Sequence, residues 1–467
     1  METLPNTKQA YQLFHEGCLA LTRAEQHGFR IDTEYCTTTR IELSHKIKML
    51  EEQLEQTQFY KDWKRSRKNS PPNINSGKQL GNYLYGVIKL TCPTKTKAGG
   101  NAVDEEVLKQ FNLPELDTII QIRKLKKIRD TYLGAFTREQ VNGVLHPFFN
   151  LHLAVTFRSS SDRPNFQNIP KRDKEAMQIC RRAIYPRKGH QLMEVDYKGI
   201  EVAIAACYHK DPVMIHYIEN PASDMHLDMA SQIFKLKNAD KKNPEIAYLR
   251  SATKNGFVFP QFYGDYYKGC AVSLMKWGQL PESRWNGKQG VLLNGKTLSQ
   301  HLIDHNIKSA SAFIEHIREI EDDFWNTRFK IYNRWKIRHW KTYQKNGFID
   351  LKTGFRCQGV MKENDIINYP IQGSAFHCLL WSFIEMDKEI IQRKLQTRLV
   401  GQIHDAIILD VAPGELEEIS ILLQRVMCQK LREHWKWINV PLSIDADLAG
   451  VDESWADVKG FKLPEPK

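Results

Sequence analysis

The chain has 467 residues, of which 41% are hydrophobic and 26% are charged. This composition excludes disordered and fibrous proteins, and no apolar run approaches the roughly 18 residues of a transmembrane helix. The formal net charge of +12 favours a polyanionic partner, either nucleic acid or a membrane surface. The first residues show no basic region followed by an apolar stretch, so no secretory signal is predicted.

The nine cysteines are scattered along the chain, and no two are spaced as Cys-x-x-Cys. An odd number without such pairs favours reduced thiols in a cytoplasm-like compartment. The sequence therefore predicts a cytoplasmic protein without a zinc site or a redox dithiol.

The first third of the chain is predicted to be helical and basic. Residues 8–57 repeat apolar side chains at steps of three or four, namely Leu43, Ile47, Leu50 and Leu54. The basic run 64–68 precedes Asn-Ser-Pro-Pro, which predicts a loop. A second basic cluster, 123–129, lies on a helical pattern that turns three apolar residues inward, Ile119, Ile122 and Leu125. Either run alone indicates a solvated surface, but the two together favour contacts with a phosphate backbone.

The pattern changes near residue 185. Residues 192–195 form a short apolar stretch that ends in Asp196, and residues 200–207 read as a helix. Long helices are predicted over 310–340 and around 379–390, because apolar residues recur there on one stripe. Residues 399–403 and 406–409 flank Asp405, which predicts a β-hairpin with the acid at or near its turn. The chain is therefore predicted to be α+β and mainly helical.

Asp196 and Asp405 stand out because each adjoins an apolar strand. Either one alone reads as an ordinary turn or cap residue. If the strands are neighbours, however, both carboxylates emerge at one edge of one sheet, where they repel each other unless a cation intervenes. Two divalent ions held by carboxylates are a common arrangement for phosphoryl transfer.

A third segment carries cations next to aromatic rings. Arg250 and Lys254 are four residues apart and share one helix face, and aromatic residues follow from Phe257 to Tyr263. Cations with a ring surface suit the phosphates and the base of a nucleoside triphosphate. The alternative is an amphipathic helix with exposed charges and a buried aromatic side.

Residues 290–297 satisfy the phosphate-binding pattern G-x-x-x-x-G-K-T. That loop requires a strand before it and a helix at the Lys. Here apolar residues flank Asn294 and Gly295, a strong signal for a two-residue β-hairpin. We therefore predict a hairpin, inside a stretch (276–310) that looks like an insertion.

With these motifs in order, the chain resembles the family A DNA polymerases. Asp196-Tyr197-Lys198-Gly199-Ile200-Glu201 and Gln402-Ile403-His404-Asp405 are similar to the two palm motifs of that family, and the segment from Arg250 to Gly264 is similar to its fingers helix. Further segments match in the same order, at 73–80, 131–132, 156–170, 224–226, 353–356 and 368–373. The resemblance covers about residues 10–460.

The resemblance implies a role for each matching residue. Asp196 and Asp405 would bind two catalytic Mg²⁺ ions, assisted by the carbonyl of Tyr197. Lys254 would act as an acid toward the leaving pyrophosphate. The other residues around the dNTP would be Arg250, His226, Phe259, Tyr263 and Glu201. Contacts with the primer-template DNA would come from Arg158, Gln372, Asn368 and His404.

Two of these positions concern the sugar. In the family, the acid five residues after the first catalytic Asp occupies the space of a ribose 2′-hydroxyl, so Glu201 favours dNTPs. The fingers motif contains one extra residue, since Tyr263 lies nine residues after Lys254 instead of eight. Counting back from Tyr263 selects Phe259 as the sugar-facing ring, and counting forward selects Val258. We choose Phe259, which predicts weak acceptance of dideoxynucleotides and a buried Phe257.

Four further residues depart from the family pattern: Phe157, Gly199, Asn364 and Ala406 replace Gly, Gln, Arg and Glu. The metal-binding pair is unaffected.

The resemblance implies a right-hand architecture with a thumb, a split palm with an antiparallel sheet, and helical fingers. The predicted boundaries are 1–44 for a helical lead-in, 45–145 for the thumb, 146–210 and 346–467 for the palm, and 211–345 for the fingers. Residues 13–32 already resemble the entry to the polymerase module, so we expect no intrinsic 3′–5′ exonuclease and no 5′ nuclease.

We therefore predict a template-directed DNA polymerase of a phage-like type, which would work in the cytoplasm of a bacterial host. A separate exonuclease, helicase or processivity factor would be a partner, and a membrane would not. Two alternatives remain: an RNA polymerase or primase-like enzyme, against which Glu201 argues, and an inactive nucleic-acid-binding homologue, against which the intact acidic and basic residues argue.

Overall fold

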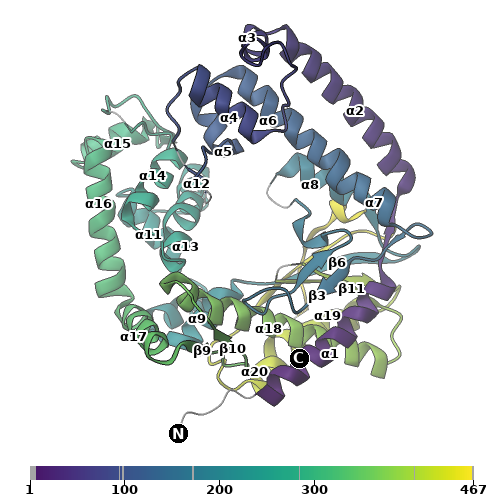
Figure 1. Ribbon diagram of the computed structural model, residues 1–467. Coiled ribbons are helices and arrows are strands. Elements are labelled where there is room, and N and C mark those ends of the chain that lie inside the picture. The colour runs from purple at the N-terminus through teal and green to yellow at the C-terminus, as the bar shows by residue number, and fades with distance from the viewer. Residues whose placement is uncertain are drawn as a thin grey trace.

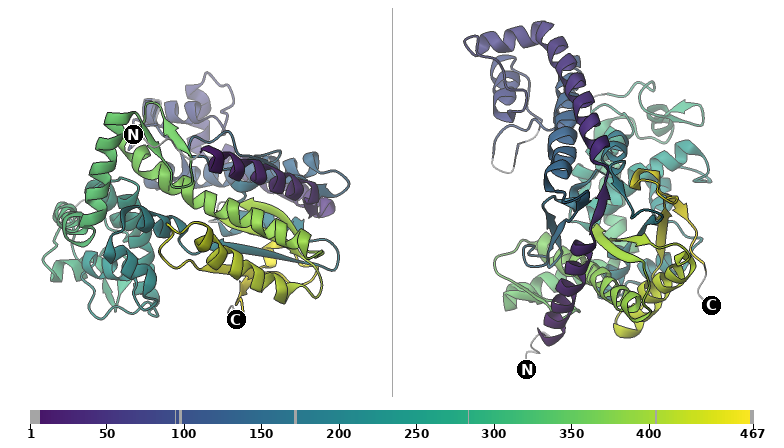
Figure 2. Two further views of the ribbon diagram at one scale, coloured as in Figure 1. Left: turned by 90° about the horizontal axis from the view of Figure 1, so that it is seen from below. Right: turned by 90° about the vertical axis from the view of Figure 1, so that its right-hand side faces the viewer.

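The computed structural model describes residues 7–93, 95–96, 99–170, 173–282, 284–403 and 405–464. In Figure 1 helices and strands surround the middle of the view on all sides. Long helices stand at the top and right, a group of helices lies at the left, and a sheet with its helices forms the base (Figure 1). Figure 2 shows the first helix lying along the base and the next long helix rising from it.

A five-stranded antiparallel sheet forms the base, in the order β11-β12-β6-β13-β14. Its strands are β6 (Gln191–Tyr197), β11 (Arg398–Ile403), β12 (Ala406–Val411), β13 (Ile444–Leu448) and β14 (Lys459–Phe461). β11 and β12 form the predicted hairpin, with Asp405 in its turn. β6 pairs directly with β12, so the two acid-bearing strands are neighbours, as the analysis of Asp196 and Asp405 supposed.

The sheet separates two hydrophobic cores because successive side chains of a strand point to opposite faces. Met193 and Val195 belong to the core shared with α18 (Glu363–Gln392), α9 (Ile200–His209) and α1 (Thr7–His27), whereas Leu192 belongs to the core of the upper helices. The remaining elements of the base are α8 (Lys174–Arg181), α19 (Leu416–Gln424), η7 (Arg425–Lys430), α20 (Leu431–His434), η8 (Trp455–Asp457), β3 (Phe148–Asn150), β4 (Ser160–Asp162) and η4 (Phe166–Asn168).

The upper helices are built around the pair α2 (Thr33–Gln56) and α6 (Pro114–Lys126). The predicted inward residues Ile119, Ile122 and Leu125 are fully buried. The shorter elements are α3 (Gln58–Ser66), α4 (Gly77–Gly81), η1 (Asn82–Val87), α5 (Glu105–Leu108), η2 (Lys109–Phe111), η3 (Lys127–Leu133) and α7 (Gly134–Glu139). A small sheet of β1 (Phe29–Ile31), β2 (Val144–Leu145) and β5 (Ile184–Tyr185) joins them to the base.

The predicted loop at 64–68 was wrong in its first half. Lys64, Arg65 and Ser66 form the last turn of α3, and the loop begins at Arg67. Lys and Arg are good helix formers, and cations near a helix C-terminus interact favourably with the helix dipole. The polar composition of this run therefore did not prevent a helical end.

The helices at the left of Figure 1 make up the third group. They are α10 (Pro212–Glu219), α11 (Met225–Ile233), α12 (Pro244–Thr253), η5 (Lys254–Val258), α13 (Phe259–Phe262), α14 (Tyr267–Trp277), α15 (Leu298–Asp304), α16 (Ala310–Asp323), η6 (Phe324–Arg328) and α17 (Lys330–Asn346). β9 (Phe348–Asp350) and β10 (Arg356–Gln358) lead back to α18. The stripes predicted over 313–324 and 379–390 are both buried.

The G-x-x-x-x-G-K-T segment is the predicted hairpin. Its strands are β7 (Leu292–Leu293) and β8 (Lys296–Thr297), and the two residues between them, Asn294 and Gly295, have φ of 50° and 78°. Positive φ at both central positions defines the type I′ turn of a two-residue hairpin. This segment is therefore no phosphate-binding loop.

The division of the chain at 44/45, 145/146, 210/211 and 345/346 stays a prediction. At the first of these boundaries α2 continues without a break from Thr33 to Gln56. Among the described residues, no helix combines the length and the apolar character that crossing a bilayer would require.

Candidate active site

Asp196 and Asp405 lie at the same end of the base sheet. Asp196 is the sixth residue of β6 and pairs in register with Ala406, which directly follows Asp405. The backbone N–H of Tyr197 donates to the carbonyl of Asp405 at 3.4 Å. The two carboxylates are therefore carried by adjacent strands that are tied together by the sheet.

Three polar side chains gather beside these aspartates. The Nη2 atom of Arg158 lies 3.3 Å from the Oε1 of Glu201 and 3.7 Å from the Oδ1 of Asp405. The hydroxyl of Tyr263 donates to the carboxylate of Glu201. Five residues from four distant parts of the sequence thus converge on one end of the sheet, and all five are predicted site residues.

The side chain of Tyr197 points away from this group. Its hydroxyl lies 2.8 Å from the Ser382 hydroxyl and donates to the carbonyl of Met427 at 2.9 Å. The side chain is 5% exposed. Only the backbone of Tyr197 is therefore placed to take part in the site, which agrees with the carbonyl role that the resemblance implies.

Arg250 lies on α12 and is held by an acid that the sequence analysis did not assign. Its Nε atom donates to both carboxylate oxygens of Asp224, at 3.0 and 2.8 Å. Asp224 also caps α11, since it accepts from the backbone N–H of Leu227 at 3.1 Å. Burial alone would raise the pKa of Asp224, but the hydrogen bonds from Arg250 and Leu227 lower it overall.

The extra residue of the fingers motif is accommodated by a π-helical turn. Residues Lys254–Val258 are π-helical between the α-helices α12 and α13, and a π-turn takes up one more residue than an α-turn. Phe257 and Val258 are fully buried. Phe259 lies on the other side, with the Nζ of Lys254 5.3 Å from its ring centroid.

The ring of Phe259 thus shares a surface with three predicted dNTP contacts, Lys254, His226 and Tyr263. The ring centroids of His226 and Phe259 are 5.8 Å apart, and those of Phe259 and Tyr263 are 6.3 Å apart. Because Val258 is buried, its side chain cannot face the sugar of a bound dNTP. The choice of Phe259 as the sugar-facing ring stays a prediction.

His226 is a neutral imidazole near pH 7. Burial, followed by the charges of Arg250 and Lys254, lowers the pKa of His226 to about 4. Within the described part of the chain its Nδ1 atom is buried without a hydrogen-bond partner. Because buried polar atoms normally have a partner, this nitrogen is suited to a ligand.

The start of α18 contacts the end of the fingers helix. The side-chain amide of Asn368 donates to the carbonyl of Tyr263, and that of Asn364 donates to the carbonyl of Gly264, both at 3.3 Å. One turn later, α18 approaches residue 156 so closely that a Cβ at Gly373 would lie 2.6 Å from the Thr156 carbonyl oxygen. Gln372 is thereby brought next to the segment that carries Arg158.

Phe157, which stands in place of a Gly, has the backbone conformation that favours Gly. Its φ is 57°, which is uncommon for a bulky residue. Its ring packs against Phe355 at 4.9 Å, and its carbonyl accepts a hydrogen bond of 3.1 Å from Nε2 of His377. These contacts hold the residue immediately before Arg158.

His377 is the centre of that support. Burial lowers the pKa of His377 to about 3, so the ring is neutral and its Nδ1 accepts from the Thr353 hydroxyl at 2.6 Å. The ring thus links α18, the β9–β10 turn and Phe157. The sequence analysis missed this residue, because a His among apolar residues reads as core.

The remaining predicted site residue, His404, lies outside the described residues.

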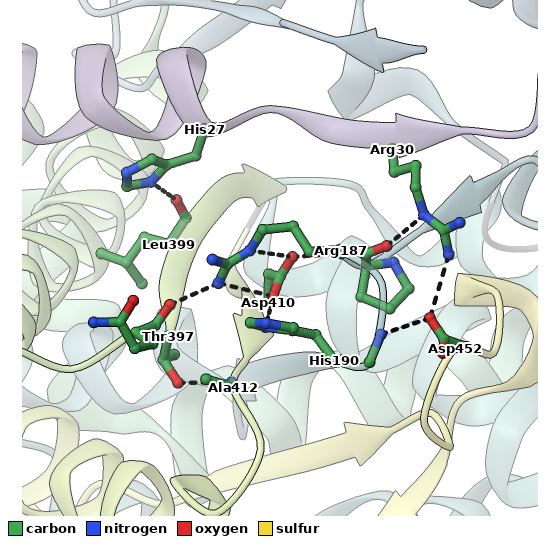
Figure 3. Close-up of polar contacts among 12 residues, drawn as sticks. His27, Arg30, Arg187, His190, Thr397, Leu399, Asp410, Ala412 and Asp452 are labelled. Carbon is green, nitrogen blue, oxygen red and sulfur yellow. Dashed lines mark hydrogen bonds and ion pairs between the residues drawn. The ribbon is translucent and has the colours of Figure 1, made fainter.

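The opposite end of the sheet carries an aspartate in a different environment. Asp410, near the far end of β12, accepts from the backbone N–H and the guanidinium of Arg187, at distances of 2.7 to 3.2 Å. The Nδ1 of His190 lies 2.7 Å from its Oδ1 atom. Figure 3 shows both side chains pointing at this carboxylate, with Arg30 and Asp452 beside them.

No group of three or more His, Cys, Asp or Glu side chains in the described ranges could hold a metal by itself. Mg²⁺ does not require one, because proteins usually bind it through one or two carboxylates together with substrate phosphates. Asp196 and Asp405 are two such carboxylates on adjacent strands. The residues present therefore fit a magnesium site that is completed by a nucleotide.

Comparison with known proteins gives the family of this chain. A family model described as DNA polymerase family A matches residues 33–276 and 333–457. The chain belongs to DNA polymerase family A, as its motifs indicated. The model passes over 277–332, which contains most of the stretch predicted to be an insertion.

Curated relatives and a solved structure agree with this assignment. The chain is 27% identical over 442 residues to DNA polymerase I of Chloroflexus aurantiacus and 28% identical over 454 residues to that of Bacillus subtilis. These matches cover 92% and 94% of this chain but only 41% and 45% of the relatives. The chain thus spans less than half the length of these two relatives.

The solved structure is the POL domain of Pol1 from M. smegmatis in complex with DNA primer-template and dNTP. It matches 94% of this chain and 69% of its own, with a TM-score of 0.71 and 22% sequence identity. The likeness confirms the predicted fold class, an α+β right-hand polymerase.

Proposed function

We propose that this chain is a template-directed DNA polymerase that adds dNTPs to the 3′ end of a primer. The observation that carries the proposal is the position of Asp196 on β6 and of Asp405 in the turn before the adjacent strand β12, next to Arg158, Glu201 and Tyr263. Tyr263 belongs to the same helical segment as the cations Arg250 and Lys254. Family membership and the DNA-bound and dNTP-bound structural relative support the same reaction.

In the proposed reaction the primer 3′ oxygen attacks the α-phosphorus of a dNTP, and the bond from that phosphorus to pyrophosphate breaks. Asp196, Asp405 and the carbonyl of Tyr197 would hold two Mg²⁺ ions, which supply charge neutralisation for the attacking and leaving oxygens when bound. Arg250 and the neutral His226 would hold the triphosphate, and Lys254 would give a proton to the leaving pyrophosphate.

The proposed arrangement also assigns the sugar and the DNA. Glu201 would occupy the space of a ribose 2′-hydroxyl, with Phe259 against the sugar. Arg158 and Gln372 would contact the minor groove near the primer end, where the acceptor positions are shared by correct base pairs. Asn368 would act by positioning Tyr263, to whose carbonyl it donates.

We further propose that the thumb is built on α2 and α6, that its boundary lies nearer Thr33 than residue 45 because α2 is continuous, and that the protein works in the cytoplasm. A phage-type origin and the lack of 3′–5′ exonuclease activity stay predictions. A separate exonuclease, helicase or processivity factor stays a predicted partner.

Primer extension tests the proposal. The chain is incubated with Mg²⁺ and a primer-template, with either dNTPs or rNTPs, and with Asp405→Ala as the comparison. We expect extension by dNTPs that is lost in the variant. Extension by rNTPs alone would favour the RNA polymerase alternative, and tight DNA binding without extension would favour the inactive homologue. A primer with a mismatched 3′ end, incubated without nucleotides, should keep its length if no exonuclease is present.

A further inference from the structure

Helix α17 (Lys330–Asn346) carries a row of positive charge that the proposed active site does not use. The helix contains no Asp or Glu. Five exposed cations follow one another at steps of four, four, three and four residues: Lys330, Arg334, Arg338, Lys341 and Lys345. Residues at these steps share one face of a helix, and the fifteen steps from the first cation to the last span about 22 Å. We call these five residues the α17 stripe.

No acidic side chain in the described part of the chain neutralises the α17 stripe. In the ranges that the structure describes, none of its five cations forms an ion pair. The opposite face of α17 is buried through Tyr332 and Trp335, so the stripe faces away from the core. Uncompensated cations repel one another at this spacing, and a polyanion relieves that repulsion.

The surface of the stripe is more than a row of charges. A shallow depression of about 410 Å³ is lined by Arg334, Ile337, Arg338, Lys341, Thr342 and Lys345. Ile337 lies between the cations and is 48% exposed. A phosphate backbone suits the cations, and the apolar side chain suits a sugar or an unpaired base.

The C-terminal end of α17 is connected to the proposed active site. The hydroxyl of Tyr343 donates to the carbonyl of Gly359 at 2.6 Å and accepts from the backbone N–H of Met361 at 2.9 Å. These residues lead directly into α18, where Asn364 and Asn368 bind the carbonyls that follow the fingers helix. The helix that carries the stripe is therefore tied at its C-terminal end to the segment that positions Tyr263, through the face opposite the stripe.

We propose that the α17 stripe binds the unpaired template strand ahead of the primer end. The inference rests on the proposed function, because it assigns the stripe to a substrate of that reaction. Single-stranded DNA is favoured over an acidic protein, since the stripe is a regular row of cations on a helix that is tied to the proposed polymerase site. It is favoured over duplex DNA because Ile337 offers an apolar contact that a duplex backbone does not need.

The experiment measures binding of primer-templates by fluorescence anisotropy. One DNA has a 5′ template overhang of about 2 nucleotides and the other has about 12, within the usual range of single-strand sites. The test variant combines Arg334→Gln, Arg338→Gln and Lys341→Gln. The control combines Arg425→Gln, Arg432→Gln and Lys436→Gln, which removes the same charge from exposed positions on the base.

The wild-type chain should bind the long overhang more tightly than the short one, and the test variant should lose this difference. Each phosphate contact contributes about 0.7 to the slope of log K against log salt for a single strand, so three lost contacts should lower the slope by about 2. At 0.15 M salt, this corresponds to a loss of about 10- to 50-fold on the long overhang. Binding of the short overhang should be unchanged, and the control should behave as the wild type.

Three results would overturn the inference: equal binding of both DNAs by the wild type, an equal loss by the variant on both DNAs, or tighter binding of a downstream duplex than of the single strand. Primer extension on the short-overhang DNA, measured alongside binding, distinguishes a failure of the stripe assignment from a failure of the proposed polymerase function. If the wild type extends that primer but shows no overhang dependence, only the stripe assignment fails. If it shows the overhang dependence without extension, the stripe is a single-strand binding surface and the polymerase proposal fails.

Discussion

Asp405 directly precedes strand β12 and Asp410 lies near its other end, and the two differ in what surrounds their carboxylates. The side chain of Asp405 is 27% exposed, with the nearest Arg158 nitrogen at 3.7 Å. That of Asp410 is 4% exposed and is held by Arg187 and His190. At the far end of the strand, Asp410 is buried and its charge is compensated by Arg187 and His190. At the near end, the carboxylate of Asp405 is accessible to a ligand.

This difference separates stability from activity along one strand. A buried carboxylate that loses its partner costs several kcal/mol of stability, so the far end tolerates little change. Two nearby carboxylates repel each other until a cation binds, so removing one acid from the near end should cost little stability. Substitution of Asp410 should therefore lower the stability of the protein, and substitution of Asp196 or Asp405 should lower its activity.

The largest effect is expected for Asp196→Asn. Loss of one of two metal-binding carboxylates removes several kcal/mol of charge stabilisation in the transition state, which corresponds to a rate loss of about 1000-fold or more. The melting temperature should stay the same or rise, because a like charge is removed. Single-turnover incorporation and thermal unfolding measure the two quantities. Activity within about tenfold of the wild type would remove Asp196 from the mechanism.

At the anchored end, Asp410→Ala should lower the free energy of unfolding by about 3 kcal/mol, since Arg187 and His190 lose their shared acceptor. The rate of incorporation per folded molecule should be close to that of the wild type. Urea unfolding and active-site titration provide the two values. A stable variant with little activity would mean that this end of the sheet also takes part in the reaction.

Substitutions of Glu201 test whether the site around Asp405 also selects the sugar of the nucleotide. Glu201→Ala should lower the preference for dNTPs over rNTPs by about 10- to 200-fold, the range expected when a small steric difference is removed. Glu201→Gln fills the same space and should keep most of the preference. The ratio of kcat/KM for the two nucleotides is the measurement, and an unchanged ratio in the Ala variant would contradict the assignment.

His377 concerns the support behind Phe157, and its effect appears only at acidic pH. The folded protein holds this ring neutral with a pKa of about 3, whereas an unfolded His has a pKa of about 6.5. Stability should therefore be lost as the pH falls below about 6.5, by up to about 1.4 kcal/mol per pH unit from this residue. His377→Gln should show a correspondingly weaker decrease between pH 6 and 4. Equal pH slopes in both proteins would exclude this contribution.

The strands that carry the aspartates could be predicted because their signals are local. The apolar run before Asp196 and the two runs around Asp405 each have strand length, and the pairing of β6 with β12 then brings the acids together. The hairpin at 292–297 was recognisable for the same reason, since Asn-Gly selects one turn type.

Contacts between distant segments could not be predicted in this way. The sequence revealed one extra residue after Lys254 but not the π-helical turn that accommodates it. Nothing local indicated that Asp224 would pair with Arg250, 26 residues away. The positive φ of Phe157 likewise depends on His377, 220 residues further along the chain.

The most direct test of the central claim measures Asp405→Asn and Asp410→Asn side by side. Single-nucleotide incorporation with Mg²⁺ and dNTP is recorded per folded molecule, together with the melting temperature of each variant. We predict that Asp405→Asn abolishes incorporation at an unchanged melting temperature and that Asp410→Asn lowers the melting temperature while the folded molecules remain active. Incorporation by the Asp405 variant at the wild-type rate would contradict the account.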